Sequence, residues 1–521
     1  MDGGFDDDEP FIFRLNDSGT GPGLLVKVCA ERGWRMYPGY HSGLEERWNL
    51  WWKTSAFPAA SYKTLGDWQF MNHIPKGGSI CRKDNLSRLL RCMKRIYGAV
   101  YDFSPPCYHL PLEYAKLVSE CSRLRRDENG AGANVVWIHK PVAQSQGRGI
   151  FLFRSLCEMN CGTSAVVQRY IERPLLIAGY KFDLRGMCPA KPTHPHVAST
   201  REIRYFLFHT NSTDKYTLSD IHNPYRHLTN SSLNKSGPRY AECKDRIGSG
   251  CKWTLTQVRK ALIGRWGAAE WVVWQRIRAL VTLTLLAQAA GTPPARNCFE
   301  FYGFDVLLDD CLKPWLLEVN LSPALASDCE ADIVVKQPML HELFDLLGLP
   351  MKHTGLAKLK APPPPTQLTN SSEEENNGGS RARTRSAGRR TARPRRRRAL
   401  PLHCVTLAGP GATTNTPPPT PPSGLPEKEK IQESAEKTKE VHGARYKTDT
   451  NSDADVQLPV EDVRESVAQV SKFVRAAREV SREFGKDTSG PRDASRDAVF
   501  EEALRKKLDF GPHFQVWLPP F

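Results

Sequence analysis

The feature that most constrains the fold is an apolar hairpin near residue 310 that carries polar oxygen donors. One strand reads FYGFDVLL from residue 301, and the next reads KPWLLEVN from residue 313, with a turn at Asp309-Asp310 between them. Asp305, Glu318 and Asn320 stand where an isolated carboxylate would be costly to bury. Because Mg²⁺ is usually held by one or two carboxylates together with substrate phosphates, the hairpin predicts a magnesium site. A structural ion pair is the alternative.

A small loop between two predicted strands is the second feature. Strands at 134–139 and 149–154 flank the loop, which reads KPVAQSQGR from Lys140 to Arg148. Glycines let a backbone approach a ligand closely, while Lys140 and Arg148 supply positive charge for phosphates. The lysine-serine pair of a P-loop does not follow, so an ordinary hairpin turn explains the loop equally well.

Charged side chains alternate in the segment that reads KFDLR from residue 181. An extended chain projects Lys181, Asp183 and Arg185 from one face, because successive side chains of a strand point to opposite sides. This arrangement suits a cleft that holds a charged ligand. A solvated strand face would show the same pattern.

The rest of the chain predicts a mixed α/β or α+β fold. Strands also fit residues 164–170, and helices fit residues 84–97, 111–126, 255–263 and 271–289. The longest apolar stretch, residues 279–290, is too short to cross a bilayer, so it predicts a buried helix. The fourteen cysteines include no C-x-x-C pair and are typical of reduced thiols in the cytosol.

The composition changes sharply after residue 350. A proline-rich linker is followed by ten arginines between residues 381 and 398, and the whole chain has a formal net charge of +16. A segment with so few apolar residues cannot offset the entropy cost of ordering its chain. Roughly residues 355–455 should therefore be disordered. Apolar residues then return at helical spacing and predict a late helix. They are Val463, Val467, Val470, Phe473 and Val474.

The order and separation of these motifs resemble those of the tubulin tyrosine ligase-like family, and its polyglutamylases in particular. The resemblance covers about residues 30–350. Further matching pieces are Trp48-x-x-Trp51, Asn72-His73-x-Pro75, Arg82-Lys83-Asp84, the run HLTNSSLNK from His227, the run GCKWTL from Gly250, and the run NLSPAL from Asn320. The resemblance implies an ATP-grasp-like core within an α+β fold. It divides the chain into an N-terminal extension (1–30), a catalytic region (31–350), a disordered Pro/Arg-rich linker (351–455) and a tail with a helix (456–521).

The resemblance also implies the site residues. ATP would be bound by Lys140, Arg148, Gly149, Gln168, Arg169, Tyr170, Ile171, Lys181, Phe182, Asp183, Thr229 and Asn230. Magnesium would be held by Asp305, Glu318 and Asn320, with Arg185 and Glu318 catalytic. Lys235 and Lys336 would bind the carboxylates of the amino-acid substrate.

The implied reaction is ATP-dependent addition of glutamate to glutamate side chains of tubulin tails, through an acyl-phosphate intermediate. Its cofactors would be ATP and Mg²⁺, and its partners free glutamate, the acidic tails of tubulin in microtubules, and accessory proteins. No membrane partner is expected, and a nucleic acid only through the arginine run. The expected location is the cytoplasm and cytoskeleton, with the cilium or basal body as a further place.

One segment departs from the family pattern. Between residues 186 and 212 the family has an apolar strand and then an E-G-x-x-R turn, whereas this chain has Pro189, Pro192 and Pro195 close together. Prolines so placed predict that no central strand forms there. Because the E-G-x-x-R turn of the family is not present, a substrate arginine is also expected to be missing. Three other functions therefore stay open: an inactive member that binds nucleotide or microtubules, a glycine ligase, and a nucleic-acid binder built on the arginine run.

Overall fold

The computed structural model describes thirteen stretches of the chain. They are residues 10–39, 47–127, 135–142, 144–159, 162–190, 208–247, 251–267, 269–289, 291–293, 295–349, 354–356, 460–484 and 494–508. The chain divides into two units, residues 1–362 with 454–521, and residues 363–453. All described residues belong to the first unit. The arginine run and most of the linker predicted to be disordered lie outside the described residues.

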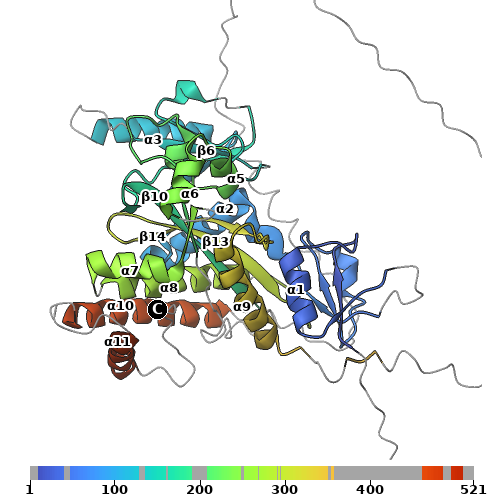
Figure 1. Ribbon diagram of the computed structural model, residues 1–521. Helices are drawn as coiled ribbons and strands as arrows, with labels where there is room; N and C mark the ends of the chain where they lie inside the picture. Colours follow the sequence, from blue (N-terminus) through green and yellow to red (C-terminus); the bar gives the residue numbers. More distant parts are fainter. Residues whose placement is uncertain are drawn as a thin grey trace, which may run out of the picture. The chain divides into compact units, whose positions relative to one another are not determined.

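A six-stranded sheet forms the centre of this unit (Figure 1). Its strand order is β12-β11-β10-β13-β14, and β9 pairs with β10 at one end. The strands are β9 (Leu176–Ile177), β10 (Tyr180–Ala190), β11 (Phe208–Asn211), β12 (Lys252–Thr254), β13 (Glu300–Leu308) and β14 (Pro314–Asn320). On β10, Phe182 and Leu184 face an apolar core, so the alternate residues Lys181, Asp183 and Arg185 lie on the opposite face.

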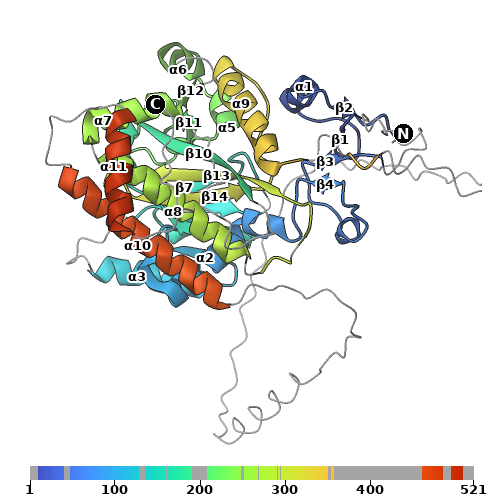
Figure 2. The same cartoon turned by 90° about the horizontal axis from the view of Figure 1, so that it is seen from below.

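Helices cover the apolar face of this sheet (Figure 2). They are α2 (Lys83–Tyr97), α7 (Leu255–Trp266), α8 (Ala269–Ala289) and α10 (Val460–Phe484). Helix α8 is buried almost all round, which confirms the buried helix predicted for its apolar stretch. Val463, Val467 and Val470 of α10 pack into the same core, and α11 (Ala494–Lys507) packs with α10 against Trp271. No helix in the described parts of the chain has the length and apolar character needed to cross a membrane.

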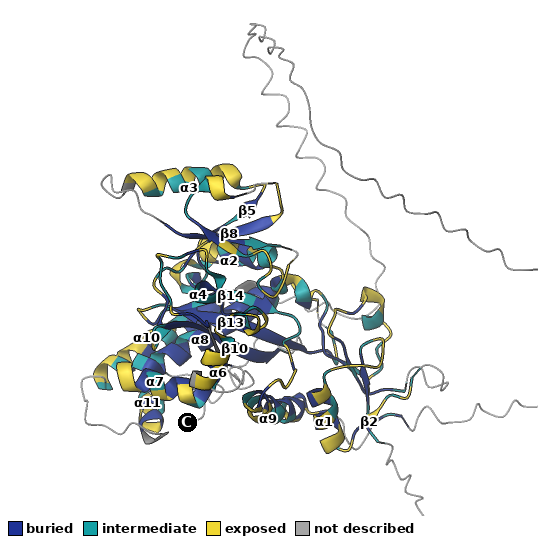
Figure 3. Ribbon diagram, turned by 45° about the horizontal axis from the view of Figure 1, so that its top comes forward, coloured by how far each residue is buried: buried dark blue, intermediate teal, exposed yellow. Residues whose placement is uncertain are grey.

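A smaller antiparallel sheet, ordered β5-β8-β6-β7, lies near the polar face of the large sheet. Its strands are β5 (Cys107–Leu110), β6 (Trp137–Pro141), β7 (Phe151–Phe153) and β8 (Ala165–Arg169), and α3 (Tyr114–Asp127) covers it. Figure 3 shows buried strands beneath a helix whose outer side is exposed. The remaining short helices are η4 (Gly98–Tyr101), η5 (Leu156–Glu158), α4 (Pro224–His227), α5 (Ser231–Lys235) and α6 (Tyr240–Ile247). Tyr101 of η4 belongs to the core of the large sheet.

A third sheet near the N-terminus is parallel, in the order β2-β1-β3-β4. It contains β1 (Ile12–Leu15), β2 (Arg35–Met36), β3 (Leu50–Trp52) and β4 (Phe70–Met71), with η2 (Ala59–Tyr62) between β3 and β4 and η3 (Gly77–Cys81) after β4. Helices α1 (Gly23–Glu31) and α9 (Glu330–Leu347) share its core. The predicted boundary at residue 31 therefore falls inside this sheet and its helices.

The prediction that residues 186–190 form no central strand is wrong. Strand β10 continues to Ala190, and residues 184–190 pair with β13, Pro189 lying opposite Phe301. Among the described residues β11 pairs with residues 182–185, so β13 is the one described neighbour of β10 at Pro189. Strand β11 supplies the next strand of the sheet. Pro192 and Pro195 lie outside the described residues.

Candidate functional site

A cavity lies between the polar face of the large sheet and the smaller sheet. Eleven of the residues predicted from the sequence line it: Lys140, Gln168, Arg169, Tyr170, Ile171, Lys181, Asp183, Thr229, Asn230, Asp305 and Glu318. Seven further lining residues are Pro105, Ile138, Ile150, His227, Leu228, Leu307 and Leu317. The cavity thus has cations, carboxylates and apolar walls together, as a site for a phosphate-bearing ligand requires.

The two carboxylates of the hairpin face each other. Asp305 on β13 is directly opposite Glu318 on β14, and the register shifts beside this pair, so that Val306 pairs with Leu316. Leu317 is therefore the extra residue of a bulge, which brings both Leu317 and Glu318 to the cavity wall. Burial raises the pKa of Asp305 well above its ordinary value, and the neighbouring Glu318 adds to this effect.

Cations surround this pair. Arg185 on β10 is opposite Asp305 and holds it with two hydrogen bonds of 2.8 and 3.0 Å. The Lys83 ammonium lies 3.7 Å from Glu318 Oε2. Burial opposes the ionisation of Glu318, but Lys83, a hydrogen bond from Asp305, Lys140 and Arg185 lower its pKa below the ordinary value. The site therefore favours an ionised Glu318.

Lys83 is a residue to which the sequence analysis assigned no role. It begins α2, and its ammonium also donates a hydrogen bond of 3.2 Å to the carbonyl oxygen of Gln144. Gln144 belongs to the glycine loop, which comprises residues 140–149 and is named for Gly147 and Gly149. Lys83 thereby joins the loop to the carboxylate pair. The one sequence feature that pointed to Lys83 was its place in the motif Arg82-Lys83-Asp84, which matches the family.

The glycine loop closes against the start of α5. Gly147 has φ of 78°, and a Cβ added there would lie 2.9 Å from Oδ1 of Asn230. A side chain at this position would be strained and would crowd Asn230. The loop backbone therefore lies close to Asn230, and such a close approach is typical of a cradle for phosphates.

Other predicted residues lie elsewhere. Phe182 is 1% exposed and faces the apolar core, so its side chain cannot reach the cavity, and Arg148 is an exposed residue of the loop. Lys235 pairs with Asp328 at 2.6 Å, and Lys336 pairs with Asp332 at 2.9 Å, so both gather around one segment after β14. Gly149, Arg185 and Asn320 do not line the cavity, although Asn320 follows Glu318 by two residues on β14.

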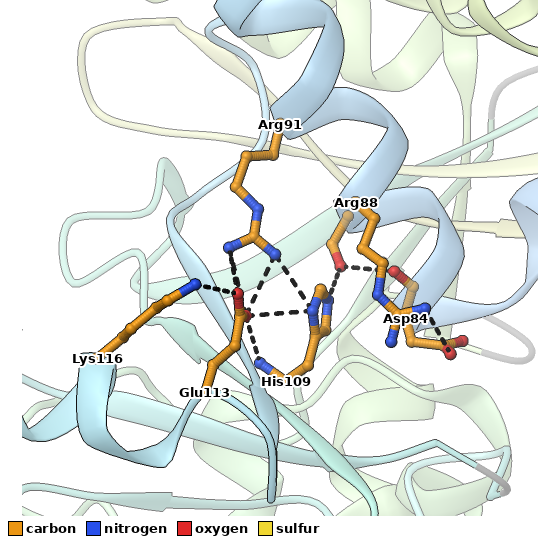
Figure 4. A network of polar contacts seen from close by, with 7 residues as sticks. Asp84, Arg88, Arg91, His109, Glu113 and Lys116 are labelled. Carbon is orange, nitrogen blue, oxygen red and sulfur yellow. Dashed lines mark hydrogen bonds and ion pairs between the residues drawn. The ribbon is translucent and has the colours of Figure 1, made fainter. Parts of the chain in front are cut away.

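A polar network fixes the smaller sheet on α2 (Figure 4). Arg91 donates hydrogen bonds to Glu113 and to Nδ1 of His109, whose Nε2 lies 2.6 Å from the hydroxyl of Ser87. Burial opposes ionisation of Glu113, but Arg91 and the backbone N–H of His109 lower its pKa to about 2. The network therefore ties β5 and the start of α3 to the helix that carries Lys83.

The residues present fit a divalent cation and a nucleotide. Two carboxylates side by side, the buried Asp305 and the half-buried Glu318, repel each other, and a cation between them would relieve this repulsion. Lys140 donates a hydrogen bond of 2.8 Å to Gln168 within the cavity, and burial lowers its pKa to about 8. An anionic ligand would favour the charged lysine. The cavity therefore brings carboxylates, two lysines and the glycine loop together, and the magnesium and phosphate site remains a prediction.

Comparison with known proteins decides the family. The model named "Tubulin-tyrosine ligase family" matches residues 61–355, more than half of the chain. This chain belongs to the tubulin-tyrosine ligase family. Its core has the ATP-grasp-like, mixed helix-and-sheet fold predicted from the resemblance.

Two relatives in this family carry the same name in different species. The human "Probable tubulin polyglutamylase TTLL2" is 40% identical over 345 residues, which are 66% of this chain and 56% of the relative. The mouse protein of that name is 39% identical over 345 residues, and 62% of it is covered. The mouse "Tubulin polyglutamylase TTLL5" is 34% identical over 312 residues, 58% of this chain and 23% of that protein. The chain thus matches less than two thirds of each relative's length.

One titratable group in the cavity gives a testable pH dependence. Burial lowers the pKa of Lys181 to about 7, although Asp183 opposes this effect and Lys140 adds to it. Lys181 is therefore charged below pH 7 and becomes neutral above it, so it should attract an anionic nucleotide more strongly at pH 6 than at pH 8. We expect nucleotide affinity to fall several-fold over this range, since each pKa unit corresponds to a factor of about ten.

Isothermal calorimetry with ATP and Mg²⁺ at each pH measures this dependence. The same titration of Lys181→Met is the control, because protonation of the nucleotide itself and of Lys140 affects both proteins alike. The ratio of the two affinities should shrink as the pH rises through 7. A ratio that does not change with pH would contradict the prediction.

Proposed function

We propose that the chain is an ATP- and Mg²⁺-dependent ligase that adds glutamate to glutamate side chains of tubulin tails. The observation that carries the proposal is the opposition of Asp305 and Glu318 on the wall of a cavity that also holds Lys140 and Lys181. The names of its relatives as tubulin polyglutamylases support the choice of substrate.

The residues of the chain have separate parts in this proposal. Asp305, Glu318 and Asn320 would hold Mg²⁺, while Lys140, Lys181 and the glycine loop would hold ATP. When bound, ATP and Mg²⁺ supply the activation of an acceptor carboxylate as an acyl phosphate and neutralise its charge. Arg185 is anchored on Asp305, so it can offer its remaining N–H groups to the oxyanion that develops when an amine attacks a carbonyl carbon.

In this proposal the amino-acid substrate is bound by Lys235 and Lys336, which do not line the cavity. Lys235 pairs with Asp328 and Lys336 with Asp332, and Lys336 also donates a hydrogen bond of 2.6 Å to the carbonyl of Ala326. Each is held by a carboxylate, so a free glutamate would have to compete with Asp328 for the exposed Lys235. The acidic tail of tubulin suits the formal net charge of +16, and the proposed place of action is the microtubule cytoskeleton.

Incorporation of radiolabelled glutamate into microtubules by the purified full chain tests the proposal. Labelling that requires both ATP and Mg²⁺ is the expected result. Parallel reactions with radiolabelled glycine distinguish the glycine ligase. No labelling with either amino acid, by a folded protein that binds ATP, would refute the ligase and leave an inactive member of the family.

A further inference from the structure

A chain of hydrogen bonds lies behind the Lys181 ammonium at one wall of the cavity. Lys181 Nζ donates to the hydroxyl oxygen of Tyr170 at 3.0 Å and to the backbone carbonyl of His227 at 2.7 Å. The same hydroxyl lies 3.1 Å from Nδ1 of His227. Lys181, Tyr170 and His227 are 5%, 6% and 1% exposed. This hydrogen-bonded group is therefore almost fully removed from solvent.

Backbone carbonyl groups limit the directions of these hydrogen bonds. His227 Nε2 lies 2.8 Å from the carbonyl oxygen of Asp220, which can only accept, so Nε2 carries the proton. Burial lowers the pKa of His227 to about 4, so the ring is neutral at pH 7 and its Nδ1 is an acceptor. Tyr216 donates to the carbonyl oxygen of Glu172, so its hydroxyl oxygen is a second acceptor beside Tyr170. The hydroxyl of Tyr170 therefore donates its one proton to Nδ1 or to this oxygen. The Tyr170 oxygen is left to accept from Lys181, in agreement with the observed distance.

This arrangement leaves one donor for a ligand. An ammonium group has three N–H bonds, and among the described residues two of those of Lys181 are used by Tyr170 and His227. Ile138, Tyr170 and Leu228 belong to one apolar cluster, against which Ile150 packs, and all four also line the cavity. A flat aromatic ring with an acceptor nitrogen at its edge is the kind of group that fits an apolar wall with one fixed donor.

We propose that Tyr170 and His227 are positioning residues that aim the Lys181 ammonium at the base of a bound adenine nucleotide. The inference rests on the proposed function, since it takes ATP as the ligand of this cavity. Neither side chain takes part in the chemistry of ligation. Their role is to fix the direction of one hydrogen bond, and removal of either should make that donor less well directed.

Competition binding on the full chain tests the proposal with two probes. A fluorescent ATP analogue is displaced by ATP, which has a base, or by inorganic tripolyphosphate, which has none. We expect Tyr170→Phe and His227→Leu each to weaken ATP about tenfold, the effect of one hydrogen bond, and to leave tripolyphosphate unchanged. The double variant should lose no more than either single variant, because both changes break one chain of bonds.

The conservative variant His227→Asn separates positioning from packing. An asparagine Oδ1 near the former Nδ1 can still accept from Tyr170, so ATP affinity should return toward that of the unmodified chain. Equal weakening of ATP and tripolyphosphate, or additive losses in the double variant, would overturn the inference in favour of a structural role. Unchanged ATP affinity in all variants would overturn it as well. Failure of the unmodified chain to bind ATP would instead refute the proposed function.

Discussion

Replacing Glu318 with glutamine should reduce glutamate incorporation into microtubules about 100-fold or more, with little change in folding. Glutamine has nearly the shape of glutamate but lacks the charge that a divalent cation needs. Metal stabilisation of transition-state charge amounts to several kcal/mol, and about 1.4 kcal/mol corresponds to a tenfold change in rate. The loss should be largest at low Mg²⁺ concentration, because the variant binds the ion through fewer anionic oxygens.

The matched control is Glu120→Gln, which makes the same chemical change on α3. Glu120 forms its ion pair with Arg123 of the same helix, at 2.8 Å, and does not line the cavity, so its loss should leave the rate unchanged. Rates are measured with radiolabelled glutamate over a series of Mg²⁺ concentrations. A Glu318→Gln protein that is as active as the unmodified chain at limiting Mg²⁺ would exclude Glu318 as a metal ligand.

Local patterns in the sequence predicted much of this site. The alternation of Lys181, Asp183 and Arg185 placed these side chains on one face of a strand, and β10 has that arrangement. The same rule explains why Phe182, between them, faces the core instead. Two-residue alternation is a property of any extended chain, so it could be read without knowledge of the neighbouring strands.

The bulge at Leu317 could not be predicted in this way. Strict alternation along β14 places Leu317 and Glu318 on opposite faces, whereas the shifted register brings both to the cavity. The same limit applies to Pro189, which pairs with Phe301 of β13 although prolines argue against a strand. Both features depend on which residues of a distant strand pair, and the composition of one strand does not contain that information.

Long-range contacts also account for the N-terminal sheet. Its strands contain two to four residues each and pair in parallel, so no periodic pattern marks them. Helix α9 completes their core from more than 250 residues away in the chain. The buried position of Trp52 against Phe344 results from tertiary packing, which cannot be predicted from the sequence of a short segment.

The buried charges beneath α11 lead to the largest expected effect on stability. Glu270 of α8 accepts a hydrogen bond of 2.7 Å from Arg259 of α7 and one of 3.0 Å from Arg496 of α11. Asp497 accepts from the same two arginines, at 2.8 and 3.1 Å. All four residues are less than 10% exposed. Two positive and two negative charges therefore balance where α7, α8 and α11 meet.

Glu270→Leu should lower the free energy of unfolding by about 3–5 kcal/mol, because it leaves two buried arginines with one carboxylate between them. The indole N–H of Trp274, which also donates to Glu270, loses its acceptor in the same variant. Urea denaturation followed by circular dichroism measures the change. The control is Glu501→Gln on α11, where the pair with Arg505 is more exposed and should contribute no more than about 1 kcal/mol.

A second variant distinguishes charge imbalance from loss of packing. A fourfold variant exchanges all four charged residues for apolar ones: Arg259→Met, Glu270→Leu, Arg496→Met and Asp497→Leu. It removes the charge imbalance and leaves no buried ion unpaired. Apolar replacement of a whole buried ion network is often neutral or stabilising, so this protein should be more stable than Glu270→Leu alone. If the fourfold variant were the less stable of the two, the hydrogen bonds themselves would hold α11 in place. The ionic balance would then be secondary to their geometry.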